Sequence, residues 1–286
     1  MKYAFRFWKF RCQMAAGAWL VFSSGCTTHE QKHSVPPLLL NSQGISFSPV
    51  PMVSLEAPDE AKAFQLLFSI EEVSEAQMAE FHAALGINGS SGENASKAKA
   101  ACNVSWTEAV AYCAWLTQKE RASGFLKGEQ RYRLPSDHEW SCAVGIGHLE
   151  SKETAPEAKG KGKISFYPWG QTWPPPSGVG NLAGMESRFD FPENHIAGFK
   201  DRYRHHKVGL RVSKPNRFGL YDMSGNLWEW CDDRFRPGRD WRVLRGGSWM
   251  TARPETLLSS HRTHDPENYR SNSVGFRIVL EDKRRP

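Results

Sequence analysis

The stretch that decides the fold is Gly219-Leu-Tyr-Asp-Met-Ser-Gly-Asn-Leu-Trp-Glu-Trp-Cys231. It is followed by Arg242-Val-Leu-Arg-Gly-Gly-Ser-Trp249 and then by Val274-Gly-Phe-Arg-Ile-Val-Leu280. Within these segments, the runs 241–244 and 275–280 have the composition of short strands. The whole chain contains 11 tryptophans. So many large aromatic side chains in a loop-rich sequence predict a core built by aromatic packing under long loops.

Upstream of this region, three helices are predicted from capping boxes, in which a serine precedes Glu or Gln by three residues. They run from Ser74 to about Leu85, from Ser105 to about Glu120 and from Ser136 to about Gly145. Their expected buried residues are Met78, Phe81, Ala84 and Leu85 in the first helix, and Val110, Cys113 and Leu116 or Thr117 in the second.

The first 26 residues have the features of an export signal. Four basic residues precede the apolar run 14–22, and the small residues 23–25 form a cleavage zone. The apolar run is shorter than the roughly 20 residues that a membrane-spanning helix needs. Cys26 comes next, as in a bacterial lipoprotein box, so we expect a protein lipid-anchored to a membrane of the bacterial cell envelope. The alternative is ordinary cleavage after Gly25, which gives a soluble exported protein.

The charge and the cysteines limit the kinds of partner. The leader holds four basic residues and no acidic residue, so the net charge of +6 falls to +2 in the exported chain. A charge this small does not indicate a nucleic-acid partner. In an oxidising compartment four thiols allow three complete pairings, and the sequence does not choose among them. The four are Cys102, Cys113, Cys142 and Cys231, and none has the close spacing of a structural zinc site.

The chain divides by composition into a leader, a tether, one domain and a short tail. Residues 27–50 are polar and contain three prolines, so we expect a tether or, alternatively, an ordered N-terminal arm. Residues 51–282 form the domain and residues 283–286 the tail. Within the domain, the charged and glycine-rich stretch 151–163 predicts a surface loop.

Further blocks at residues 103–115, 132–140, 167–170 and 216–223 join the segments quoted above. Taken in order from about residue 68 to residue 280, the blocks resemble the formylglycine-generating enzyme (sulfatase-modifying factor) domain family. The resemblance implies an α+β fold related to the C-type lectin fold. That fold has little regular secondary structure, and calcium holds its long loops.

The resemblance also implies two structural calcium sites. Calcium binds six to eight hard oxygen ligands, and carboxylates mixed with backbone carbonyls supply them. The alternative at both sites is a turn and a strand whose carboxylates pair with nearby arginines. The first site is implied at Asn181, Leu182, Asp201 and Tyr203, and the second at Asp222, Gly225, Leu227 and Glu229.

The oxidase chemistry of the family does not transfer to this chain. The family's oxidases bind copper through a cysteine pair that lies just beyond a pocket serine. Ser248 matches that serine, but Thr251 stands at the place of the first cysteine, and no cysteine follows Cys231. Copper(I) selects soft sulfur ligands, for which a threonine hydroxyl is a poor substitute. We therefore expect no copper and no formylglycine-generating activity, and Ser248 and Thr251 are kept only as pocket candidates.

The segment 249–272 is expected to line the pocket of this fold. Its mixture of polar, charged and aromatic residues suits recognition of a polar ligand or a peptide. A histidine metal site is not favoured, because the adjacent His205 and His206 diverge on a regular backbone. The candidate pocket residues are Trp249, Arg253, His261, Arg262 and His264.

The sequence therefore favours a binding protein for a polar ligand or an envelope protein, held at the membrane by a lipid. One alternative is a formylglycine-generating oxidase or another metal-dependent oxidoreductase acting on sulfatases or peptides. A second alternative is a structural protein of the envelope.

Overall fold

The computed structural model describes residues 39–87, 95–160, 164–203 and 208–282. The predicted export signal with Cys26, residues 27–38 of the predicted tether, His205, His206 and the tail lie outside the described residues. Among the described residues, no helix is both long enough and apolar enough to cross a membrane.

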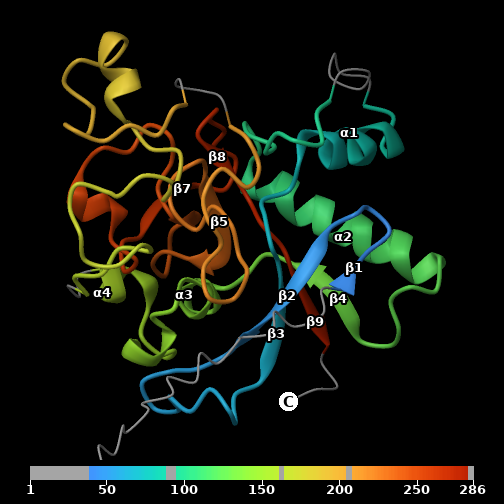
Figure 1. The fold of residues 1–286 in the computed structure, drawn as a ribbon. Helices are drawn as coiled ribbons and strands as arrows, with labels where there is room; N and C mark the ends of the chain where they lie inside the picture. The colour runs from blue at the N-terminus through green and yellow to red at the C-terminus, as the bar shows by residue number, and fades with distance from the viewer. Residues whose placement is uncertain (1–38, 88–94, 161–163, 204–207, 283–286) are drawn as a thin grey trace, which may run out of the picture. The chain divides into compact units, whose positions relative to one another are not determined.

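The helices of the described chain are short and lie mainly in its first half (Figure 1). The α-helices are α1 (Glu75–Ala84), α2 (Trp106–Ala122), α3 (Asp137–Val144) and α4 (Pro156–Gly160). The 3-10 helices are η1 (Gly147–Leu149), η2 (Met185–Phe189) and η3 (Pro254–Leu257).

Two sheets carry the fold. The first has the strand order β1-β2-β3-β9-β4 and is antiparallel throughout. The second has the order β7-β6-β5-β8, in which only β5 and β8 are parallel. The strands are β1 (Leu39–Leu40), β2 (Ser46–Pro51), β3 (Gln65–Ser69), β4 (Gln130–Arg133), β5 (Trp228–Arg234), β6 (Trp241–Arg245), β7 (Thr263–Pro266), β8 (Val274–Gly275) and β9 (Val279–Asp282).

The predicted helix starts are confirmed. Ser74 and Ser136 each form a complete capping box, and Ser105 accepts a hydrogen bond from the backbone N–H of Glu108. Each cap satisfies a backbone donor that would otherwise lack a partner, which is worth about 1 kcal/mol. The predicted buried face of α1 is only partly right, because Met78 and Phe81 are buried and the C-terminal Ala84 and Leu85 are exposed.

The helix α3 packs against both sheets. It contacts β2 of the first sheet and β5 and β6 of the second sheet. Its C-terminus is closed by Gly145, whose φ of 97° is a left-handed conformation that glycine adopts readily. The helix therefore joins the two sheets through its own buried side chains, chiefly Trp140.

The core is aromatic, as predicted. Phe81 packs edge-on against Tyr112 at 5.7 Å between ring centroids, and Tyr112 packs against Phe276 at 5.5 Å. Trp140 and Trp230 are buried, and their indole N–H groups donate to Glu229 and to the carbonyl of Val104. Each aromatic pair adds roughly 0.5–1.5 kcal/mol of stability beyond the contribution from burial of its surface.

Two expectations need correction, and the open question of cysteine pairing has an answer. Residues 39–50 of the predicted tether are ordered and include β1 and most of β2, which is the alternative of an N-terminal arm. The stretch 151–163 includes the short helix α4, in which Lys159 is buried. The four domain cysteines are all unpaired, and three of them are buried, so the fold does not depend on disulfides among the described residues.

Candidate functional site

Thr251 closes a tight turn with Ser248. The hydroxyl of Thr251 accepts a hydrogen bond of 2.9 Å from the backbone N–H of Ser248, and the N–H of Thr251 donates to the Ser248 carbonyl, also at 2.9 Å. Both side chains are buried. The structure thus brings the two pocket candidates together, and it uses the threonine hydroxyl to hold the backbone.

The predicted pocket segment does not form one surface. Trp249 is buried, and its indole N–H donates to the carbonyl of Asn272 at 3.1 Å. His264 is stacked between Phe235 and Trp241, with centroid distances of 4.2 and 4.5 Å. Trp249 is therefore a core residue, and His264 is part of an aromatic stack.

The other three candidates in this segment have unlike surroundings. Arg253 is exposed. Burial lowers the pKa of His261 to about 4, and the nearby guanidinium groups of Arg245 and Arg262 act in the same direction. Arg262 is buried and fully engaged in ion pairs, so it serves the structure. Within the described residues, no group of three or more His, Cys, Asp or Glu side chains is arranged to hold a metal ion.

The residues implied for the first calcium site lie together. The Asp201 carboxylate accepts hydrogen bonds of 2.9 Å from the backbone N–H groups of Leu182 and Tyr203. Burial raises the pKa of Asp201 to about 6, and the carboxylate of Glu186 contributes to the rise. One oxygen of Glu186 is buried without a hydrogen-bond partner. Two neighbouring carboxylates with an orphaned oxygen form a donor set that fits a hard cation such as calcium.

The residues implied for the second site have a different arrangement. Arg277 donates to both carboxylate oxygens of Glu229, at 2.6 and 2.7 Å, and Trp140 donates to the same carboxylate at 2.8 Å. The expected alternative, a carboxylate paired with an arginine, therefore holds for Glu229. Burial raises the pKa of neighbouring Glu72 well above its ordinary value, and the carboxylates of Asp222 and Glu229 contribute. Three buried carboxyl groups, those of Glu72, Asp222 and Glu229, thus lie near the single guanidinium of Arg277.

The two implied sets are in backbone contact. The N–H of Asn226 donates to the carbonyl of Asn181 at 2.7 Å. A Cβ added at Gly225 would lie 2.2 Å from that same carbonyl oxygen, and the residue has a φ of 73°. Only glycine permits both this approach and this conformation without strain. The turn 224–226 and the segment 181–182 therefore hold each other in place.

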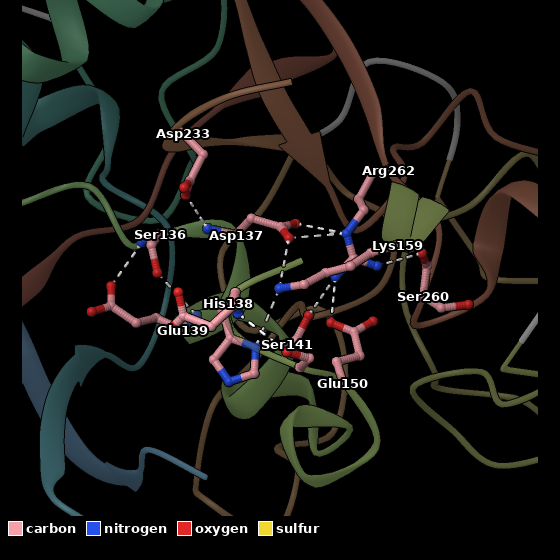
Figure 2. Close-up of polar contacts among 12 residues, drawn as sticks. Ser136, Asp137, His138, Glu139, Ser141, Glu150, Lys159, Asp233, Ser260 and Arg262 are labelled. Atoms are coloured by element: carbon pink, nitrogen blue, oxygen red, sulfur yellow. Dashed lines mark hydrogen bonds and ion pairs between the residues drawn. The ribbon is translucent and has the colours of Figure 1, made fainter. Parts of the chain in front are cut away.

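A buried charge cluster around Asp137 was not foreseen from the sequence (Figure 2). Asp137 is the first residue of α3, and its carboxylate accepts from Arg245 at 2.5 Å and from Arg262 at 2.8 Å. Arg262 also reaches Glu150 at 2.5 Å, and Lys159 lies 3.6 Å from Asp137. We call this the Asp137 cluster; it consists of Asp137, Glu150, Lys159, Arg245 and Arg262.

The electrostatics of the Asp137 cluster follow from its burial. Burial alone would raise the pKa of Asp137, but the guanidinium groups of Arg245 and Arg262 outweigh it and hold the pKa below the ordinary value. Each member exposes 4% or less of its side chain. Three cations therefore face two carboxylates in a region that excludes water.

Comparison with known proteins places these features in a family context. The profile of the sulfatase-modifying factor enzyme 1-like domain matches residues 41–282. The chain is 31% identical over 185 residues to the inactive C-alpha-formylglycine-generating enzyme 2 of Mus musculus, which covers 62% of this chain and 47% of the relative. It is 25% identical over 177 residues to the chaperone protein LppX of Paenibacillus barcinonensis, which covers 60% of this chain and 51% of that protein.

The fold is also similar to solved structures. The structure of PvdO from Pseudomonas aeruginosa superposes with a TM-score of 0.51 at 17% identity, over 86% of this chain and 98% of PvdO. At this identity the likeness concerns the fold alone, and it confirms the predicted class. The chain spans about half the length of the curated relatives it matches.

The Asp137 cluster generates the first prediction. Replacing Asp137 with Asn leaves the buried Arg245 without a carboxylate partner and Arg262 with Glu150 alone, so the free energy of unfolding should fall by about 3–5 kcal/mol. Urea denaturation of the purified domain measures the loss. The matched control is Asp240→Asn, which breaks the exposed Arg234–Asp240 pair and should cost less than about 1 kcal/mol.

The stability difference between the wild type and Asp137→Asn depends on pH. Because the folded-state pKa of Asp137 is depressed, its contribution is complete above the ordinary Asp pKa of about 4. That contribution is lost as the pH falls through the lower pKa of the folded state. The stability gap between the wild type and Asp137→Asn should therefore narrow on acidification. Equal stability of both proteins at neutral pH would contradict a structural role for the cluster.

Proposed function

Because the chain belongs to the sulfatase-modifying factor enzyme 1-like domain family, we propose that it is a binding domain of that family without copper oxidase chemistry. In this proposal the protein is exported and lipid-anchored, and it recognises a ligand or an envelope partner. The observation that carries the proposal is the turn between Ser248 and Thr251. At the position where the resemblance implies a copper-binding thiolate, the buried hydroxyl of Thr251 accepts a hydrogen bond from the backbone N–H of Ser248.

The remaining thiols support the same conclusion. Burial raises the pKa of Cys113 and Cys231 above the ordinary thiol value, and it raises the pKa of Cys142 to about 12. A thiolate is the form that binds copper(I) and reacts as a nucleophile, so these cysteines are poor candidates for either task. The likeness to a relative named as an inactive formylglycine-generating enzyme also supports a non-oxidase function.

The oxidase assay tests this proposal. The purified protein should form no peptide aldehyde above the protein-free rate when a Cys-x-Pro-x-Arg peptide is incubated with it, copper and oxygen. Thr251→Cys should also remain inactive, because a single thiolate does not replace a cysteine pair. Mass spectrometry of the peptide measures the product, and an active formylglycine-generating enzyme is the positive control. Aldehyde formed by the wild type in many turnovers per protein would overturn the proposal.

We further propose that calcium stabilises the loops around Asp201. The donor set of Asp201 and Glu186, with the carbonyls of nearby loop residues, is the part of the site that fits the ion. Bound calcium would supply positive charge and fixed coordination, without taking part in a reaction. The acidic region around Asp222 is the second candidate position, although Glu229 is held there by Arg277.

Calcium removal gives the corresponding prediction. A ligand present at about 100 times its dissociation constant stabilises the folded state by about 2.7 kcal/mol, so EGTA should lower the melting temperature by roughly 5–10 °C. The variants Asp201→Asn and Asp222→Asn locate the ion, because the one that removes a ligand should no longer respond to EGTA. An EGTA-independent melting curve for the wild type would contradict calcium binding at either place.

The lipid anchor is proposed from the leader sequence, whose residues lie outside the described structure. Changing Cys26 to Ser removes the thiol that carries the lipid, so the protein should move from the membrane fraction to the soluble fraction. Detergent phase partitioning of cells producing either form measures the change. Cys102→Ser is the control, and it should leave the partitioning as it is in the wild type. Unaltered partitioning of Cys26→Ser would exclude the anchor.

A further inference from the structure

A cleft opens beside the N-terminus of α3. It has a volume of about 520 Å³, within the roughly 300–1,000 Å³ range of small-molecule sites. Its walls come from the loop after β2, from the first turn of α3 and from α4. We call it the α3–α4 cleft. It does not include Thr251 or any residue implied for calcium.

The polar end of the cleft contains Lys159, His138 and part of the Asp137 cluster (Figure 2). Lysine is almost never buried without a partner of opposite charge. Here the Asp137 carboxylate already accepts from Arg245 and Arg262 at 2.5–3.1 Å, and the Lys159 ammonium lies farther away, at 3.6 Å. The cluster contains three cations and two carboxylates, so one cation has no carboxylate of its own within the cluster. The longer distance to Asp137 assigns that role to Lys159.

The ammonium of Lys159 also has unused hydrogen-bonding capacity. Its nearest hydrogen-bond partner is Nδ1 of His138, at 3.4 Å. Nε2 of His138 lies 2.8 Å from the carbonyl of Val53, which can only accept, so Nε2 carries the proton and Nδ1 is an acceptor. A lysine ammonium has three donors, and charge-assisted bonds are normally about 2.7–2.9 Å long. Lys159 thus makes long contacts only and can donate a short bond to a ligand in the cleft.

The acids near the cleft do not neutralise Lys159. Both carboxylate oxygens of Glu139 are held by Arg133. Asp233 accepts a hydrogen bond of 2.5 Å from the backbone N–H of Asp137. Glu56 does not line the cleft and is exposed, so solvent and salt screen its charge. Among the described residues, Asp137 is therefore the only carboxylate within 4.0 Å of the Lys159 ammonium.

Part of the wall is apolar. It consists of Met52, Val53, Phe64 and Pro156. A ligand that fills this wall gains from burial of its hydrocarbon part at roughly 25 cal/mol per Å². Together, the wall and Lys159 define a ligand with an apolar body and one negative end.

We propose that the α3–α4 cleft binds an organic carboxylate with an apolar body, and that Lys159 receives the carboxylate. This assignment rests on the proposed binding function, to which it gives a site and a ligand class. The carboxylate completes the charge balance of the Asp137 cluster, while the hydrocarbon part lies against Phe64 and Met52.

Octanoate is the probe, and 1-octanol is its matched control because it has the same chain without the charge. Isothermal titration with the full exported domain should show octanoate binding and much weaker octanol binding. Lys159→Met should weaken octanoate binding roughly tenfold or more, because a charge-assisted bond to a buried partner is lost. The octanol affinity should not change. Lys127→Met, a substitution of an exposed lysine outside the cleft, should leave both affinities intact.

The stability of Lys159→Met separates binding from a structural role. Asp137 keeps Arg245 and Arg262 in this variant, so the melting temperature should not fall. A lower melting temperature with unchanged octanoate affinity would make Lys159 a purely structural residue and overturn the proposal. Phe64→Ala provides an independent check, since it should weaken both probes. Equal affinity of the wild type for octanoate and octanol would also overturn it.

The peptide oxidation assay, run on the same preparations, distinguishes failure of the cleft assignment from failure of the non-oxidase proposal. Aldehyde formation together with Lys159-dependent octanoate binding would remove the non-oxidase proposal and keep the cleft. Absence of aldehyde together with failure to bind octanoate would remove the cleft assignment alone.

Discussion

The fold depends on buried arginines that close loops onto α3. Arg245 ends β6 and Arg262 precedes β7, and both reach Asp137 at the start of α3. On the same helix, Trp140 donates to Glu229, which Arg277 holds from the segment between β8 and β9. A buried ion pair is not by itself stabilising relative to apolar residues, but losing one partner is costly. These contacts therefore fix which loops lie against α3.

This arrangement shows what the signature segments do in this protein. Arg245, Trp140, Glu229 and Arg277 all lie in segments that carry the family resemblance, and all four are structural in this protein. Gly225 adds a backbone approach that a side chain would block. The segments that carry the resemblance thus mainly hold long loops in place without regular secondary structure.

The parts that the sequence predicted are local. Ser74, Ser105 and Ser136 cap helices because each serine and its acceptor or donor lie within one turn, and α1, α2 and α3 begin where expected. Arg262 and its partner Asp137 are 125 residues apart in the sequence, so no local sequence pattern predicts the ion pair. Lys159 stands in a charged, glycine-rich stretch of solvated composition, yet α4 buries it. Trp249 was expected at a pocket and is buried, because Asn272 satisfies its only polar atom.

The location of the α3–α4 cleft follows from the same framework. The turn between Ser248 and Thr251 is closed by its own hydrogen bonds, and Trp249 within it is buried. Polar groups at that turn are already paired, so a ligand there would have to break bonds that it could not replace. At the cleft the opposite holds, since Lys159 has contacts of 3.4 and 3.6 Å only. Binding is favoured where a buried charge is incompletely paired, and in this fold the surplus positive charge of the Asp137 cluster borders the cleft.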